Sequence, residues 1–304
     1  MRLLLIDGHY YVYRSFFAIQ GLQNSKGEPT NAIYGFIKTV RRMIKDTKPD
    51  LAAVIWDEGL PKRRTDLQPA YKQQREEMPD LMRPQLRCIQ DELTEALGFH
   101  SLSLPDTEAD DLMASYACAA RNRGDSVVLA TNDKDLFQLV DDLVKVYSTN
   151  KADLLQPKDT HVLLGAEAVL KKWGVAPHQI GDILALVGDA VDNIPGVQGL
   201  GPKGAATLIN AHGSVEQLVA NLDRVTKDSL REKLTAARDQ IHQNREMVRL
   251  DLDLPLPVPL DELKIQPRYP NLLPILERCE FKTLTEEIRA EAAKVQQPAQ
   301  GELF

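Results

Sequence analysis

The chain has 304 residues, enough for one large domain or two smaller ones, and its 43% of hydrophobic residues permits an ordinary core and excludes wholesale disorder. Its three cysteines form no CxxC pair, which argues against a disulfide framework and a zinc site. No apolar run is long enough for a signal peptide or a membrane span. We therefore expect a cytoplasmic protein with no membrane partner. The net charge of −7 argues weakly against nucleic acid as a partner, although binding depends on where the charges lie.

The first half of the chain alternates short apolar runs with stretches of helical periodicity. In chain order we predict strand 3–7, helix 31–46, strand 51–57, helix 83–98, strand 99–104, helix 109–124, strand 126–133, helix 134–140 and strand 143–148. Residues 58–87 interrupt this order with a polar stretch rich in Lys and Arg. Strands that alternate with helices predict a parallel sheet with helices on both faces. Thr107 is expected to be the N-cap of the helix that follows it.

After about residue 160 the strand signal fades, and short helices punctuated by Gly and Pro predict a smaller helical region. Residues 250–268 are rich in Pro and are predicted to run extended across the surface. The last residues, from Lys294 onward, are expected to be disordered.

Carboxylates collect where four segments of the predicted sheet end. They are Asp7, Asp57, Glu108, Asp110, Asp111, Asp133 and Asp135. Because ligands bind at the carboxyl ends of parallel strands, we expect these side chains to meet at one edge of the sheet. Each alone could be a turn residue or an acid that favours a helix dipole, but that explanation would have to hold four times at the same edge.

Clustered carboxylates require cations, and a set of oxygen ligands suits Mg²⁺ or Mn²⁺. The six histidines are scattered and show no HExxH motif, which argues against zinc. Since one Mg²⁺ needs only one or two protein carboxylates, this set indicates two or more ions, an arrangement suited to phosphoryl chemistry.

Two more acids stand in residues 187–209. Asp189 and Asp192 are three positions apart, which predicts that they share one face of a helix. Residues 193–195 are expected to end that helix.

A glycine-rich turn follows these acids. Gly196, Gly199 and Gly201 surround a tight turn into a helix predicted to start near Pro202. The backbone N–H groups of such a turn, with Lys203 beside them, are suited to holding a phosphate. The alternative is an ordinary connection between two helices.

Four motifs, IDGHYYVYRSF, TEADDLMASYA, TNDKDLFQLV and LALVGDAVDNIPGVQGLGPKGA, occur in this order and resemble the bacterial and phage 5′-nuclease (flap endonuclease) family. That family includes the N-terminal 5′→3′ exonuclease domain of DNA polymerase I. The resemblance extends to about residue 288 and leaves no room for a polymerase, so the chain is expected to be a stand-alone member.

The resemblance implies an α/β fold with a parallel-sheet, PIN-like nuclease core, an inserted helical arch and a smaller α-helical region that contains a helix–three-turn–helix DNA-binding element. On this basis the core is expected at 1–175 with the arch at about 58–87, the helical region at 176–288 and a flexible tail at 289–304.

The resemblance also implies two groups of metal ligands. The first group is Asp7, Asp57, Glu108, Asp110 and Asp111. The second group is Asp133, Asp135, Asp189 and Asp192. All nine acids are present. Removing their charges from the net charge gives −7 + 9 = +2, so a metal-loaded protein need not repel DNA.

Cationic and hairpin residues of the family fall on matching positions here. Catalytic phosphate contacts are implied for Arg14, Tyr71, Lys72 and Arg75, and DNA contacts for Arg64, Gly199, Gly201 and Lys203. The hairpin is further expected to hold a K⁺ ion through backbone carbonyls. For the Lys and Arg run alone, the alternative is a solvated helix face.

The resemblance implies a metal-dependent, structure-specific 5′ nuclease that is monomeric. Its expected substrates are DNA with 5′ flaps, nicks or single-stranded 5′ ends, and RNA-primed ends, in replication and repair. Two positions depart from the family pattern. Gly204 stands where Thr is frequent, and Glu58 stands where a small residue is common.

The C-terminal residues QGELF resemble the peptide that docks in the bacterial sliding clamp. Gln300, Leu303 and Phe304 would then bind this partner, with both apolar side chains buried in its groove. The alternative is an unspecific frayed end.

Other functions remain open. The same scaffold could be a non-catalytic DNA-binding protein, but that hypothesis predicts lost carboxylates. A phosphatase acting on small molecules would need neither the basic insertion nor the hairpin. No GxGxxG follows the first strand, which disfavours a dinucleotide-dependent oxidoreductase.

Overall fold

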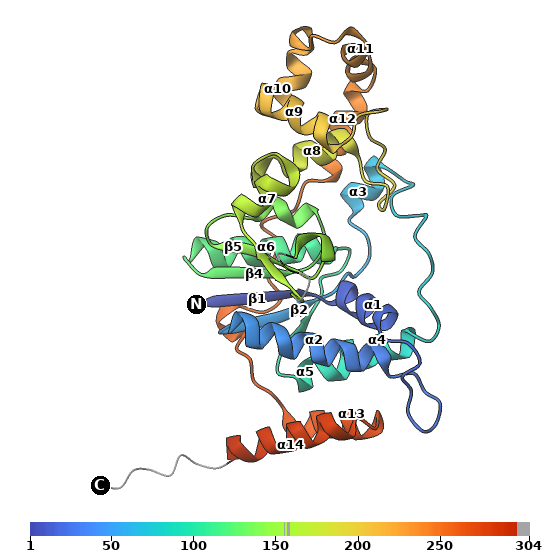
Figure 1. The fold of residues 1–304 in the computed structure, drawn as a ribbon, viewed down its shortest axis with the longest axis vertical. Helices are drawn as coiled ribbons and strands as arrows, with labels where there is room; N and C mark the ends of the chain where they lie inside the picture. The colour runs from blue at the N-terminus through green and yellow to red at the C-terminus, as the bar shows by residue number, and fades with distance from the viewer. Residues whose placement is uncertain (155, 157–158, 297–304) are drawn as a thin grey trace, which may run out of the picture. The chain divides into compact units, whose positions relative to one another are not determined.

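A computed structural model describes residues 1–154, 156 and 159–296, and the structural statements below concern these residues. The fold is mixed α/β (Figure 1), as predicted. The strands are β1 (Arg2–Asp7), β2 (Leu51–Ile55), β3 (His100–Leu102), β4 (Ser126–Ala130), β5 (Val144–Ser148) and β6 (Val162–Leu164). They belong to one sheet in the order β3-β2-β1-β4-β5-β6. The pairs β1–β4, β4–β5 and β2–β3 are parallel, and only β5–β6 is antiparallel among the described pairs.

The chain divides into two compact units that are not continuous in sequence. Unit 1 comprises Met1–Asp7, Asp57–Glu77 and Ser103–Pro257. Unit 2 comprises Gly8–Trp56, Met78–Leu102 and Val258–Phe304. This division follows contacts rather than motifs, and the boundaries expected at 175 and 288 stay predictions.

Unit 1 holds β1, β4, β5 and β6 and most of the helical region. Its helices are α3 (Lys62–Leu67), α6 (Ala109–Asn122), α7 (Ala166–Trp173), α8 (Ile180–Val187), α9 (Pro202–His212), α10 (Val215–Ala220), α11 (Asp228–Ala236) and α12 (Arg238–Met247), with short 3₁₀ turns at Asp135–Leu139, Lys151–Asp153, Pro177–Gln179 and Leu222–Arg224. The strands β1 and β4 pair in register, with Leu4 opposite Val128, and α6 packs on both. Their side chains are almost fully buried, as expected of central parallel strands.

Unit 2 holds β2, β3 and a second set of helices. These are α1 (Gly8–Ala18), α2 (Asn31–Thr47), α4 (Arg83–Cys88), a π-helical turn (Ile89–Leu93), α5 (Thr94–Ala96), a 3₁₀ turn (Leu260–Glu262), α13 (Tyr269–Arg278) and α14 (Lys282–Gln296). Within the unit, α1 packs on α2 and α13 packs on α14. The amphipathic helix predicted at 31–46 therefore corresponds to α2.

Three predictions of local structure were wrong. The segment predicted as a helix at 134–140 forms a 3₁₀ turn, and β6 lies beyond the point where the strand signal fades. Thr107 is not the N-cap of α6, because that position is Glu108, while the Thr107 hydroxyl donates to the carbonyl of Pro105. Asp57 provides the cap instead, since its Oδ1 accepts the N–H of Ala109 at 2.8 Å.

The predicted flexible tail at 289–304 is helical in its first part. The helix α14 continues to Gln296 because Leu284, Ile288 and Ala292 recur every four residues and are buried on one face. Disorder expected from Lys294 is therefore wrong for 294–296, and the rest of the tail lies outside the described residues.

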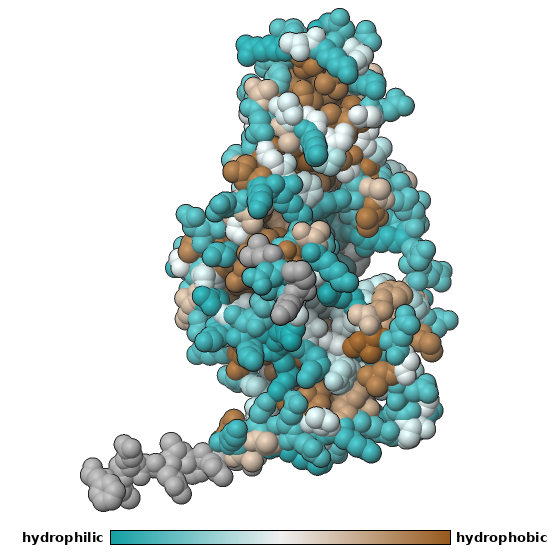
Figure 2. All heavy atoms as spheres, viewed as in Figure 1, coloured by the Kyte–Doolittle hydropathy of each residue, from teal (hydrophilic) through white to brown (hydrophobic). Residues whose placement is uncertain are grey.

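The drawn face of the molecule is mainly hydrophilic, with hydrophobic residues grouped over the region of α10 and α11 (Figure 2). Within the described part of the chain, no helix is both long and apolar enough to cross a membrane. The three cysteines, Cys88, Cys118 and Cys279, are free and buried.

Candidate metal-binding active site

The start of α6 brings three carboxylates together in unit 1. Oxygens of Glu108, Asp110 and Asp111 all lie within 4.8 Å of one another. Glu108 and Asp111 are buried and Asp110 is half-buried. Asp57 joins this group because Glu58 and Thr107 exchange backbone hydrogen bonds of 3.0 and 3.3 Å, which set Asp57 against the first N–H of the helix. Four of the five acids predicted for the first group thus lie at the start of α6, while Asp7 accepts from the hydroxyl of Thr131.

A second pair of acids follows β4. The N–H of Asp135 donates to Asp133 Oδ1 at 2.9 Å, and the N–H of Asp133 donates to the hydroxyl oxygen of Thr131 at 3.0 Å. That hydroxyl in turn donates to Asp7 Oδ2 at 2.9 Å. One threonine therefore ties the acid at the end of β1 to those at the end of β4.

Asp189 and Asp192 lie in a tight loop and not on a helix, which corrects the prediction. The helix α8 ends at Val187 because Gly188 adopts a φ of 75°, which a left-handed turn requires. Asp189 and Ile194 then exchange backbone hydrogen bonds of 2.8 and 2.7 Å and close the loop. Both acids are buried, so the loop still delivers them as a pair.

Burial of these acids disfavours their charged forms. Burial, followed by the neighbouring Asp111 charge, raises the pKa of Asp110 well above its usual range. Burial and the Asp133 charge do the same to the pKa of Asp135. Desolvation also raises the pKa of Asp133, whose carboxylate repels those of Asp192 and Asp189. The Asp133 charge also contributes to the raised pKa of Asp110, which links the second set of acids to the first.

Cations of the predicted arch lie against the acids. Lys72 Nζ forms an ion pair with Glu108 and lies 3.8 Å from Asp192, and Arg75 Nη2 lies 2.7 Å from Asp192 Oδ1. Tyr71 is buried and its hydroxyl lies 3.2 Å from both oxygens of Glu108. Burial, with the Glu108 charge, raises the pKa of Tyr71, so the phenol stays protonated and donates.

The arch segment is fastened to the loop of the second acid pair. The N–H of Lys72 donates to the carbonyl of Asp192 at 3.3 Å, and the side-chain amide of Asn193 donates to the carbonyl of Ala70 at 2.9 Å. Between residues 58 and 82 the helical structure is limited to α3, and Lys72 has a φ of 55°. These bonds hold Tyr71, Lys72 and Arg75 beside the acids.

Arg64 differs from its predicted role as a DNA contact. Its side chain is only 1% exposed and forms ion pairs with Glu108 and Asp111, with Asp110 at 3.7 Å. Burial alone would lower the pKa of Arg64. The three neighbouring carboxylates outweigh this effect and raise the pKa above its ordinary value, so the guanidinium stays charged. A side chain enclosed in this way presents no surface to DNA, because the acids that neutralise it also cover it.

Sequence reasoning missed one further cation. Lys134 Nζ lies 2.7 Å from Asp189 Oδ2. Its position between Asp133 and Asp135 in the sequence was the available signal. Glu58, by contrast, is exposed, accepts a hydrogen bond from the hydroxyl of Ser103 and is not a member of the described carboxylate cluster.

The glycine-rich hairpin forms as predicted before α9. Gly199 has a φ of 77°, and Gly201 is the N-cap of the helix that begins at Pro202. Lys203 is exposed on the first turn. A Cβ placed on Gly199 would lie 3.3 Å from Lys233 Nζ, so α11 brings a second lysine to the hairpin, which the sequence did not indicate.

Two sets of predicted residues stay predictions. Arg14 lies on α1 in unit 2, where it is exposed. Gln300, Leu303 and Phe304 lie outside the described residues.

The chemistry of the acids fits divalent hard cations. Asp135 Oδ1 is buried and has no hydrogen-bond partner among the described residues, although nearly all buried oxygens have one. Only oxygen ligands meet here, and the histidines contribute none to the described cluster, which suits Mg²⁺ or Mn²⁺ better than zinc.

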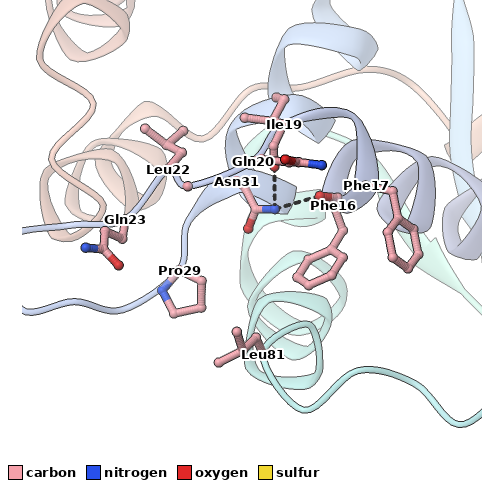
Figure 3. A pocket seen from close by; sticks show the side chains of 10 residues that line it. Phe16, Phe17, Ile19, Gln20, Leu22, Gln23, Pro29, Asn31 and Leu81 are labelled. Carbon is pink, nitrogen blue, oxygen red and sulfur yellow. Dashed lines mark hydrogen bonds between the residues drawn. The ribbon is translucent and has the colours of Figure 1, made fainter.

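Unit 2 has a pocket of its own of about 340 Å³ (Figure 3). Phe16, Phe17 and Leu81 line it, and the Asn31 amide donates to the carbonyls of Phe16 and Ile19 at 2.7 and 2.8 Å. None of its lining residues is titratable, so it offers no group for acid–base or metal chemistry.

The fold and the acid cluster together define a metal-dependent nuclease architecture, and comparisons with known proteins agree. Residues 2–174 match the 5′-3′ exonuclease N-terminal resolvase-like domain, and residues 175–271 match the 5′-3′ exonuclease C-terminal SAM fold. The chain belongs to the 5′-3′ exonuclease family.

Relatives differ in how much of their length they share with this chain. A 5′-3′ exonuclease of Aquifex aeolicus is 37% identical over 287 residues, which cover 94% of both chains. A thermostable DNA polymerase I of Thermus thermophilus is 40% identical over 94% of this chain, but this chain spans only 33% of the polymerase.

The fold also matches that of a phage protein. The bacteriophage T5 D15 flap endonuclease, in a complex with DNA and metal ions, has a TM-score of 0.68 at 23% identity and covers 83% of this chain and 90% of the phage chain. At this identity the likeness shows a shared fold.

Proposed function

We propose that this protein is a metal-dependent, structure-specific 5′ nuclease that hydrolyses DNA phosphodiester bonds at 5′ flaps, nicks and RNA-primed ends in replication and repair. The observation that carries the proposal is the cluster of Glu108, Asp110 and Asp111 beside the arch cations Lys72 and Arg75. Family membership and the DNA-bound phage neighbour support the same conclusion.

Two groups of acids would hold two or more Mg²⁺ or Mn²⁺ ions, the first around Glu108 and Asp110 and the second around Asp133 and Asp135. Such ions activate water and neutralise charge on phosphate oxygens. Tyr71 holds Glu108 in place, because its phenolic O–H donates a hydrogen bond to a carboxylate oxygen of Glu108.

Lys72 and Arg75 are suited to an exchange of partners. Lys72 forms an ion pair with Glu108, and Arg75 forms one with Asp192. If Glu108 and Asp192 were to hold metal, Lys72 and Arg75 would be available to orient and neutralise the scissile phosphate. We place Arg14 in the same role, because its family position is a phosphate contact.

The hairpin before α9 is the proposed duplex-binding site. Gly199, Gly201 and the first N–H groups of the helix form a turn that suits a phosphate, and Lys203 supplies positive charge. We also propose a K⁺ ion at the backbone carbonyls of this turn, a monomeric state and clamp binding through the C-terminal peptide.

Cleavage of end-labelled DNA tests the nuclease proposal. Labelled 5′-flap, nicked and single-stranded DNA is incubated with Mg²⁺ or with EDTA. We expect cleavage of the flap and nicked duplexes in Mg²⁺ alone. Asp110→Asn is expected to lower the rate by about a hundredfold or more, while Lys145→Ala, which changes an exposed lysine of β5, leaves it unchanged.

Two outcomes would favour the rival functions. Tight binding of flap DNA without cleavage in any divalent metal would indicate a non-catalytic DNA-binding protein. Hydrolysis of a small phosphate monoester without hydrolysis of DNA would indicate a phosphatase. Deletion of Gln300–Phe304 tests clamp binding separately: equal affinity of the full and shortened chains for a bacterial clamp would reject that part.

A further inference from the structure

The guanidinium of Arg64 is held by acids and by backbone carbonyls at once. Its Nη1 and Nη2 lie 2.9 Å from the two oxygens of Asp111, and Nη1 also pairs with Glu108. Its Nε donates to the carbonyl of Met247 at 3.0 Å, and Nη2 donates to that of Arg249 at 3.2 Å. Both charged and neutral acceptors therefore fix its plane.

The other cations of the site lack this anchoring. Lys72 Nζ contacts only carboxylates among its described ion-pair partners, and the side chains of Arg75 and Lys134 are 47% and 31% exposed. An incoming metal ion or phosphate can displace these side chains without taking a side-chain donor from a backbone carbonyl. Displacing Arg64 would leave the buried carbonyl of Met247 without its donor, which is costly, whereas the carbonyl of Arg249 would keep the Nη2 of Arg63 at 2.9 Å.

Both oxygens of Asp111 lie close to Arg64, although only Oδ1 forms hydrogen bonds and the buried Oδ2 forms none among the described residues. Oδ1 accepts from Arg64 Nη2 at 2.9 Å and from the N–H of Asp251 at 2.9 Å, and Oδ2 faces Arg64 Nη1 at 2.9 Å. Its neighbour Asp110 is less engaged, since Arg64 lies 3.7 Å away. Both acids lie within the cluster that could hold an ion, but only Asp110 keeps an oxygen free of Arg64.

The charge balance agrees with this division. Ionised Glu108, Asp110 and Asp111 carry three negative charges, and, with Asp57 and the displaceable Lys72 left out of the count, the guanidinium of Arg64 reduces them to 3 − 1 = 2. A single divalent ion then neutralises the cluster. Replacing the fixed cation by solvent would leave a buried excess of negative charge, which proteins avoid.

We infer that Arg64 is a permanent internal counter-cation and that it and Asp111 form a positioning pair, so that Asp111 orients the site without ligating the metal. The pair orients Glu108 and Asp110 toward the ion. Arg64 belongs to α3, and the pair also contacts residues 247–251 at and after the end of α12. This inference rests on the proposed metal site and deepens it.

Binding of Mn²⁺ tests the inference without measuring activity. Free Mn²⁺ is followed by electron paramagnetic resonance in titrations of wild type, Arg64→Met, Asp111→Asn, the double variant and Asp110→Asn. We expect each single change in the pair to weaken binding about tenfold, as for residues that orient ligands. The double variant is expected to lose about tenfold as well, because the pair acts as one unit. Asp110→Asn is expected to abolish the strongest site.

The results separate the alternatives. A double variant weakened about a hundredfold, the product of the single effects, would show two independent residues and overturn the pair. Loss of the strongest site in Asp111→Asn, as complete as in Asp110→Asn, would make Asp111 a ligand and overturn it too. If wild type binds no Mn²⁺, the proposed function fails together with the inference.

Wild-type protein supplies a test that needs no variant to fold. In a crystal structure with Mn²⁺ located by anomalous scattering, we expect Asp111 to keep both contacts to Arg64 and the ion to be ligated by Asp110. A Mn²⁺ ion directly bonded to an Asp111 oxygen would overturn the inference.

Discussion

Gly196 passes Val187 so closely that a Cβ on Gly196 would lie 1.9 Å from the Val187 carbonyl oxygen. Gly188 is equally confined, since its Cβ would lie 2.4 Å from the N atom of Gly196. The two glycines therefore let the chain cross itself and close the loop that holds Asp189 and Asp192. The position of the second acid pair depends on this backbone crossing.

Gly196→Ala is expected to destabilise the protein by about 3 kcal/mol, because backbone atoms cannot move aside as a flexible side chain can. Urea unfolding measures the effect. Gly201→Ala is the control: nothing lies within 4 Å of its Cβ, and only the cost of alanine at the N-cap of α9, about 1 kcal/mol or less, is expected. Equal stability of the two variants would contradict the conclusion that the close approach of Gly196 to Val187 excludes a side chain at Gly196.

The strand-end acids could be predicted from sequence because they depend on local patterns. An apolar run ending in Asp7 or Asp133 places a carboxylate at the edge of a parallel sheet whatever the rest of the chain does. In the structure the hydroxyl of Thr131 contacts both the Asp7 carboxylate and the N–H of Asp133. The α/β class and the hairpin before α9 were predictable for the same reason.

The loop of Asp189 and the burial of Arg64 could not be predicted, because both depend on distant backbone. The spacing of Asp189 and Asp192 fits a helix, and only the crossing at Gly196 excludes one. Arg64 is held by the carbonyl of Met247, 183 positions away, so its run of basic residues suggested a surface site. Tertiary contacts overrode the local pattern in both cases.

Divalent metal is expected to stabilise the protein. The mutual repulsion of Asp110, Asp133 and Asp135 persists until a cation fills the site, and an ion that binds only the folded state at a hundred times its Kd adds about 2.7 kcal/mol. Melting temperatures with Mg²⁺ and with EDTA measure the gain. Asp110→Asn combined with Asp135→Asn is the control and should show a smaller gain; equal melting temperatures of wild type with and without Mg²⁺ would contradict the metal site.

The ion pair between Arg41 and Glu291 predicts a dependence of stability on pH. Arg41 on α2 donates to both oxygens of Glu291 on α14 at 2.9 and 2.5 Å, and these hydrogen bonds lower the pKa of Glu291 below its ordinary 4.5. A lowered pKa in the folded state gives stability that is present above the unfolded value and is lost as the pH falls through the folded value.

Glu291→Gln is therefore expected to cost about 0.5 kcal/mol at pH 7, since the pair is partly exposed, and close to nothing once the pH is below the folded pKa of Glu291. Urea unfolding at both extremes measures it. Glu286→Gln changes an exposed acid of the same helix and is expected to have no such pH dependence. If the cost of Glu291→Gln were the same at low pH, the ion pair would not be its cause.

The hairpin before α9 predicts how DNA affinity responds to salt. Lys203 is exposed on the first turn of the helix, beside N–H groups suited to a phosphate. Removing one phosphate contact lowers the slope of log affinity against log salt by about one and weakens binding to all sequences alike. Lys203→Ala is therefore expected to lower the affinity for 5′-flap duplex and to flatten its salt dependence, measured by fluorescence anisotropy in Ca²⁺ over a range of KCl concentrations.

Lys145→Ala on β5 removes the same charge from the protein and is the matched control, with no expected change in slope. The Mg²⁺-dependent gain in melting temperature should be the same in both variants, because neither lysine pairs with the acid cluster in the described structure. If Lys203→Ala and Lys145→Ala changed affinity and slope equally, the effect would come from net charge alone, and the hairpin would have no specific part in holding the duplex.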